Sequence, residues 1–141
     1  MRLLTHLGGA RVSLGTGFLM IVAGERRLGL AMLLANSMSH VLVQVLKRAV
    51  ARPRPCDPSG HPLALVALPD PFSFPSGHAA AVTSITVTVV LHAPLLAPVL
   101  LPLACLVAAS RVVLRVHHVG DVLAGVALGS GGATVATLLM G

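Results

Sequence analysis

The sequence contains no tryptophan or tyrosine, and only four of its 141 residues are acidic. Charged residues make up 10% of the chain, whereas hydrophobic residues make up 55% and the mean hydropathy is +0.92. A water-soluble domain needs a polar surface, which so few charged side chains do not provide. The composition therefore excludes an ordinary soluble domain and favours a protein embedded in a membrane.

Other absences exclude further classes of protein. Several basic residues lie between positions 47 and 54 without an aromatic side chain among them, so we expect no nucleic-acid partner and instead contact with anionic membrane lipids. Neither a CxxC nor an HExxH pattern occurs, so we expect neither a metal nor another cofactor. Cys56 lies in a polar segment and Cys105 in an apolar one, which argues against a disulfide.

Five apolar stretches predict the fold. They run over about Val12–Ala23, Leu28–Leu46, Ala79–Leu91, Leu95–Leu114 and Val119–Met140. A helix that crosses a bilayer needs about 20 residues, and the second, fourth and fifth stretches meet that length. We therefore expect an all-α, polytopic membrane helix bundle with about five transmembrane helices, forming a single domain over residues 1–141.

The unusual polar residues fall in three places along the chain. These are the end of the second stretch, the start of the third, and the junction between the fourth and fifth. If every stretch crosses the membrane once, all three places lie on the same side. The pattern predicts one active site at one membrane face, although it does not say which side of the membrane that face is on.

Each of the three places carries a short motif. The motifs consist of Lys47, Arg54 and Pro55; of Pro75, Ser76, Gly77 and His78; and of Ser110, Arg111, His117 and Asp121. The three cations suit an anionic phosphate, and Ser76 with Gly77 would cap a helix whose N-terminus binds anions. His117 and Asp121 are four residues apart, so on a helix they would share a face and the carboxylate could orient the imidazole.

These spacings, K-x6-RP, PSGH and SR-x5-H-x3-D, resemble the signature of the type-2 phosphatidic acid phosphatase and vanadium haloperoxidase superfamily. The resemblance covers residues 47–121, with the motifs at 47–55, 75–78 and 110–121. It implies that His117 is the nucleophile, that His78 is the general acid, and that Asp121 belongs to the catalytic group. It also implies that Lys47, Arg54, Ser76, Gly77 and Arg111 bind the phosphate and that no metal is needed.

The resemblance implies a metal-independent phosphatase that acts through a phosphohistidine on a lipid phosphate or diphosphate. Phosphatidic acid, phosphatidylglycerophosphate and a polyprenyl diphosphate are the substrate types considered. A vanadate-dependent haloperoxidase and a non-catalytic protein that binds anionic lipids are the alternatives. We expect an integral protein of the plasma membrane. Relatives commonly have six helices, so this chain looks shortened at its N-terminus, and a partner subunit or a homo-oligomer is one way to cover the exposed face.

Two other histidines, His61 and His118, are alternatives to His78 and His117 as catalytic residues. The tetrad Pro-Ser-Gly-His also occurs at residues 58–61, but Pro62 follows His61 and disfavours a helix there, so we favour His78. On one continuous helix His118, rather than His117, would lie near Arg111. The family motif favours His117, with a helix break between it and Arg111.

The remaining polar residues are interpreted as structural. We expect His6, His40 and His92 to have no catalytic role, with His40 paired to Ser37 or Gln44 in its own helix. We expect Arg48, Arg52 and Arg115 to contact lipid headgroups, and Asp57 and Asp70 to stabilise loop turns beside their prolines.

Overall fold

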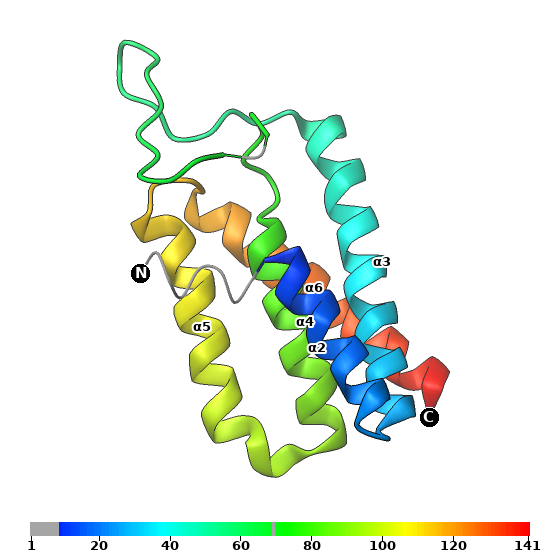
Figure 1. Ribbon diagram of the computed structural model, residues 1–141. Coiled ribbons are helices and arrows are strands. Elements are labelled where there is room, and N and C mark those ends of the chain that lie inside the picture. Colours follow the sequence, from blue (N-terminus) through cyan, green and yellow to red (C-terminus); the bar gives the residue numbers. More distant parts are fainter. Residues whose placement is uncertain (1–8, 69) are drawn as a thin grey trace.

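The computed structural model describes residues 9–68 and 70–141, and apart from two isolated β-bridges the regular elements there are helices (Figure 1). In chain order they are α2 (Ala10–Val22), α3 (Arg26–Val50), α4 (Gly77–His92), the 3-10 turn η2 (Pro94–Leu96), α5 (Ala97–Val113) and α6 (Val119–Met140). The expected all-α bundle is confirmed; four of the predicted apolar stretches each correspond to one helix, and the fourth in chain order comprises η2 and α5. His6 lies outside the described residues.

Helix length follows the length of the apolar runs. Three segments are long and apolar enough to cross a membrane: Arg26–Val50, Pro94–Val113 and Val119–Met140. Helices α2 and α4 are apolar but shorter. Helix α3 continues past the predicted end at Leu46, which places Lys47 in its last turn at one end of the bundle.

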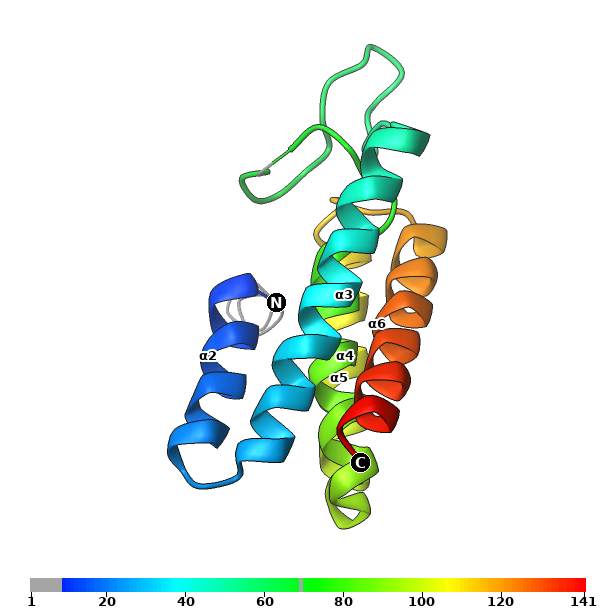
Figure 2. The same cartoon turned by 90° about the vertical axis from the view of Figure 1, so that its right-hand side faces the viewer.

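Helix α4 is the centre of the bundle and packs against α3, α5 and α6 (Figure 2). Two glycines of α6, Gly125 and Gly129, face α4 so closely that a Cβ atom at either would collide with a backbone oxygen, that of Ser76 or that of Ala80. Glycines four residues apart allow two helix backbones to approach in this way. The close packing fixes the start of α6 against the start of α4.

A long polar loop between α3 and α4 lies across one end of the bundle (Figure 1). Its two arms are joined where the Ser73 N–H donates to the Arg52 carbonyl at 2.8 Å and where Pro53 forms a bridge with Phe72. Helices α3 and α5 end at this face, and α4 and α6 begin there. The three motifs are therefore brought to one end of the bundle, as the topology predicted.

Candidate active site

The first element of the site is the start of α4. Ser76 is fully buried and is the N-cap, since its Oγ accepts the Ala79 N–H at 3.4 Å. The Ser76 N–H donates to the Asp121 carbonyl at 2.9 Å, which ties α4 to the first turn of α6. The predicted cap is confirmed, and it places Gly77 and His78 in the first helical turn, at the positive end of the helix dipole, which favours an anion.

The connection between α5 and α6 turns the chain back on itself. Arg115 adopts a left-handed conformation (φ 56°), and the N–H groups of Val116 and His117 both donate to the Arg111 carbonyl, at 3.2 and 3.3 Å. The chain therefore leaves the helix at Leu114 and folds His117 back beside Arg111. The predicted helix break between these two residues is confirmed.

The imidazole of His117 is buried and held in one orientation. Its Nδ1 lies 2.6 Å from the Ser73 carbonyl oxygen, and the side chain is only 3% exposed. A carbonyl oxygen only accepts hydrogen bonds, so Nδ1 carries the proton and Nε2 keeps its lone pair. Burial, together with the positive charges of Arg54 and Arg111, lowers the pKa of His117 from its ordinary value of 6.5 to about 3. The ring is therefore neutral at pH 7.

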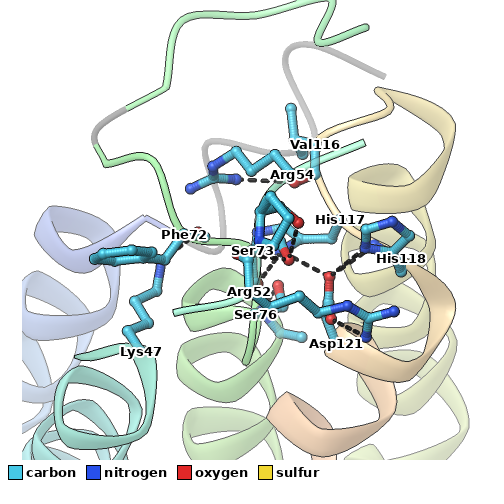
Figure 3. Close-up of polar contacts among 12 residues, drawn as sticks. Lys47, Arg52, Arg54, Phe72, Ser73, Ser76, Val116, His117, His118 and Asp121 are labelled. Atoms are coloured by element: carbon cyan, nitrogen blue, oxygen red, sulfur yellow. Dashed lines mark hydrogen bonds and ion pairs between the residues drawn. The ribbon is translucent and has the colours of Figure 1, made fainter. Parts of the chain in front are cut away.

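Asp121 makes different contacts from those expected. Its Oδ2 is 3.8 Å from Nδ1 of His117, which is too long for a hydrogen bond. Oδ2 instead accepts the His118 N–H at 2.8 Å and lies 3.2 Å from His118 Nδ1, while Oδ1 accepts from Arg52 at 3.0 Å (Figure 3). His117 precedes α6 rather than belonging to it, so the two residues do not share a helix face. The expectation that Asp121 orients His117 directly was wrong; the Ser73 carbonyl makes that contact.

The two cations of the first motif share one carboxylate. Nζ of Lys47 lies 2.9 and 2.8 Å from the two carboxylate oxygens of Asp70, and Arg54 reaches the same carboxylate at 3.1 Å. Burial would raise the pKa of Asp70, but hydrogen bonds and charge from Lys47 and Arg54 outweigh it and hold that pKa below its ordinary value. Arg54 also donates to the Val116 carbonyl at 2.9 Å, which anchors it beside the His117 segment. Asp70 thus belongs to the site and does more than stabilise a loop turn.

A cavity of about 580 Å³ begins among these residues. At the polar end it is lined by Lys47, Asp70, Gly77, His78 and His117, and further along by residues of α2, α3 and α4. The structure thus brings His78 to the same cavity as His117. The competing His61 lies in the loop with its side chain 81% exposed, and its ring contacts Ser59 and Asp57.

Arg54 and one further cation, Arg111, act on His117 through their positive charge. Arg111 is 4% exposed and Arg54 is 8% exposed, and both raise the local positive potential enough to disfavour a proton on His117. Positive charge that is held in place before a ligand arrives stabilises a phosphoryl group and its transition state. Among residues 9–68 and 70–141, no group of three His, Cys, Asp or Glu side chains could hold a metal ion.

Three residues of the site were not identified from the sequence. Ser73 contributes a backbone carbonyl, which no residue type encodes, and Arg52 was assigned to lipid headgroups although it binds the buried Asp121. Asp70 could have been suspected from the sequence, because the chain has only four acidic residues and each is therefore a candidate partner for the cations of the site. The other expected site residues lie at this end of the bundle.

Comparison with known proteins agrees with the motifs. The family model of the PAP2 superfamily matches residues 26–141. An undecaprenyl-diphosphatase of Sulfolobus acidocaldarius is 35% identical over 116 residues, covering 82% of this chain and 56% of the relative. A decaprenylphosphoryl-5-phosphoribose phosphatase of Mycolicibacterium smegmatis is 35% identical over 130 residues, covering 88% of this chain and 68% of the relative. The chain therefore spans between about half and two thirds of the length of these curated relatives.

The fold is similar to that of a solved membrane enzyme. The crystal structure of a transmembrane PAP2-type phosphatidylglycerolphosphate phosphatase from Bacillus subtilis aligns with a TM-score of 0.73 and 31% identity. The alignment covers 96% of this chain and 72% of the other. Together with the long apolar helices, this similarity identifies an integral membrane protein. By its family match, its motifs and its fold, the chain belongs to the PAP2 superfamily.

Proposed function

We propose that this chain is a membrane phosphatase that removes a phosphate from a lipid-linked phosphate or diphosphate through a phosphohistidine intermediate. The observation that carries the proposal is the state of His117. Its Nδ1 proton is donated to the Ser73 carbonyl, so the Nε2 lone pair is available in a neutral ring. A neutral imidazole surrounded by fixed cations suits nucleophilic attack on an anionic phosphoryl group.

The proposed reaction has two steps. Nε2 of His117 attacks phosphorus while the bond to the leaving oxygen breaks, and His78 gives that oxygen a proton. A water molecule then gives a proton to His78 and attacks the phosphohistidine, which releases inorganic phosphate and restores both rings. Lys47, Arg54 and Arg111, with the Ser76-capped start of α4 and the Gly77 N–H, bind the phosphoryl oxygens, while the Ser76 N–H stays bonded to the Asp121 carbonyl. Asp121 does not contact the phosphate in this scheme; it holds the His118 segment and Arg52 in place.

The substrate class follows from the surroundings of the site. The cavity continues from the polar end past α2, α3 and α4, where an apolar tail can lie beside the apolar side chains of Leu14, Val41 and Ala81. The named relatives act on an undecaprenyl diphosphate, a decaprenylphosphoryl phosphoribose and a phosphatidylglycerol phosphate. Each of these molecules joins a phosphate to an apolar tail. We extend the proposal to the plasma membrane, with exposed apolar faces of α5 and α6 against lipid tails or a second copy of the chain.

Phosphate release in detergent tests the proposal. The wild type, His117→Ala and His118→Ala would be assayed with a polyprenyl diphosphate, phosphatidic acid and phosphatidylglycerophosphate, with a chelator present throughout. Loss of the nucleophile should lower kcat by at least about 10³-fold, whereas His118→Ala, which removes a contact to Asp121, should lower it by about tenfold or less.

A trapping experiment separates this mechanism from direct attack by water. Substrate carrying a radiolabelled phosphate should leave acid-labile, alkali-stable label on the wild type and none on His117→Ala. Equal phosphate release by the wild type and His117→Ala would refute the assignment of the nucleophile. Phosphate release that occurs only when the chelator is left out would refute the metal-independent reaction.

A further inference from the structure

Helix α3 carries a row of polar side chains along the cavity. Asn36, His40 and Gln44 line it below Lys47, at successive intervals of four, four and three residues. At 100° and 1.5 Å per residue they lie within about an 80° sector, and the row runs about 16 Å from Lys47 towards the middle of the bundle. The polar lining therefore continues beyond the cations of the phosphate site, along a helix long and apolar enough to cross the membrane.

The side chain at the deep end of this row lacks a partner. Asn36 is 5% exposed, yet its amide forms no hydrogen bond with any residue in the part of the chain that the structure describes. Two other buried polar side chains of the bundle do have partners: Ser39 donates to the Ala35 carbonyl at 2.7 Å and Thr88 to the Ser84 carbonyl at 2.7 Å. An amide buried in an apolar bundle is costly unless something bonds to it, so its place on a cavity wall points to a ligand.

The middle of the row is less buried than Asn36, since Gln44 is half-buried and His40 is exposed, and both side chains line the cavity. The predicted pairing of His40 with Ser37 or Gln44 is not formed, and neither His40 nor Gln44 uses its side chain in a hydrogen bond to another described residue. The three side chains thus present two amides and an imidazole to the cavity. Such groups donate and accept hydrogen bonds without a fixed charge, which suits hydroxyl groups better than a second phosphate.

We infer that α3 forms a second subsite, made by Asn36, His40 and Gln44, which binds an uncharged hydroxylated group placed between the scissile phosphate and the apolar tail of the substrate. A sugar or a glycerol unit has this chemistry. The inference rests on the proposed function, because it places the scissile phosphate at the Lys47 end of the cavity. The apolar side chains beside the row, among them Val43 and Ala81, then contact the start of the tail.

Three synthetic lipids with the same tail test the subsite: dodecyl phosphate, dodecyl diphosphate, and dodecyl glucoside phosphorylated on its primary hydroxyl. Between the scissile phosphate and the tail, dodecyl phosphate has no group, dodecyl diphosphate has an anionic phosphate, and the glucoside phosphate has an uncharged hydroxylated sugar. The protein would be purified in an amine oxide detergent, because sugar-based detergents would compete for the subsite. The wild type should hydrolyse the glucoside phosphate with a kcat/KM about tenfold above that of either other lipid, the order expected for two added hydrogen bonds.

A double variant removes the subsite while keeping side-chain volume and helix propensity. Asn36→Leu with Gln44→Leu should bring the ratio of kcat/KM between the glucoside phosphate and dodecyl phosphate close to one. Thr134→Val is the matched control, since Thr134 is exposed on α6 and donates only to a carbonyl of its own helix. The control should keep the wild-type ratio.

The outcomes are distinct. A wild-type ratio near or below one, or an unchanged ratio in the double variant, overturns the subsite while leaving the phosphatase intact. Failure of the proposed function would instead appear as no phosphate release from any of the three lipids. In that case the subsite is judged by binding alone: dodecyl glucoside should raise the melting midpoint of the wild type more than that of the double variant, and equal shifts overturn it.

Discussion

Asp70 places a carboxylate between the two cations that we assign to phosphate binding. It receives contacts from Lys47 at 2.8 and 2.9 Å and from Arg54 at 3.1 Å, and its side chain is 31% exposed. A carboxylate and a phosphate accept hydrogen bonds from the same donors. If Lys47 and Arg54 bind the substrate phosphate, the phosphate must displace Asp70 at least in part.

The size of this competition can be worked from the contacts. A hydrogen bond to a charged group contributes about 1.5–3 kcal/mol, but water compensates much of the loss when a partly exposed carboxylate is released. A net displacement cost of about 1–2 kcal/mol remains, which corresponds to a change of about 5–30-fold in a binding constant. Asp70→Asn removes the charge and keeps the shape, including an oxygen for the Phe72 N–H that now donates to Oδ1 at 3.0 Å. The variant should therefore bind orthophosphate more tightly by about that factor.

The assay is competitive inhibition of phosphate release by orthophosphate or vanadate in detergent. Asp57→Asn is the control, because Asp57 lies on the same loop and its carboxylate accepts hydrogen bonds from Ser59 and His61, away from Lys47 and Arg54. The control should keep the wild-type inhibition constant to within about twofold. An unchanged or higher inhibition constant in a well-folded Asp70→Asn protein would refute the reasoning and assign Asp70 to holding Lys47 and Arg54 in position.

Three further changes test other parts of the structure. In phosphate-free detergent, acidification from about pH 6.5 to 5 should lower the melting midpoint of the wild type more than that of His117→Asn. The pKa of His117 is about 3 in the folded state and 6.5 in the unfolded state, so its contribution to stability is complete above pH 6.5 and declines as the pH falls towards 3. Melting midpoints that fall equally with pH in the wild type and in His117→Asn would contradict this. Gly125→Ala should lower the free energy of unfolding by about 1–3 kcal/mol, because the added Cβ meets the α4 backbone. Gly131 faces open space, so Gly131→Ala should not lower it, and equal melting midpoints for the two variants would count against the close packing of α4 and α6. Arg52→Ala should lower the free energy of unfolding by about 1 kcal/mol, because the buried carboxylate of Asp121 loses one of its hydrogen-bond donors. Arg48→Ala, exposed and bonded within its own helix, is the control, and similar denaturation midpoints for the two would show that the Arg52 contact contributes little.

Much of this protein could be predicted from the sequence because the relevant information is local. The run from Val119 to Met140 predicts α6 with the bounds that the structure gives, since an uninterrupted apolar segment of membrane-spanning length specifies a helix by itself. The cap at Ser76 is equally local, because a hydroxyl and the backbone three residues later decide it. The break between Arg111 and His117 was recognised from a motif, whereas the gathering of the three motifs at one end followed from the alternating direction of successive apolar stretches.

Only the tertiary structure decided which groups are partners. Asp121 binds His118 and Arg52 rather than His117, and the Ser73 carbonyl, 44 residues away in the sequence, fixes the His117 ring. These contacts depend on how the α3–α4 loop folds over the ends of the helices, and no spacing within one segment specifies a distance between segments. The side chains along α3 look like ordinary polar residues in the sequence. They become a candidate binding surface only when the packing of α2, α3 and α4 leaves a cavity beside them, because burial and the absence of a partner are properties of the folded chain.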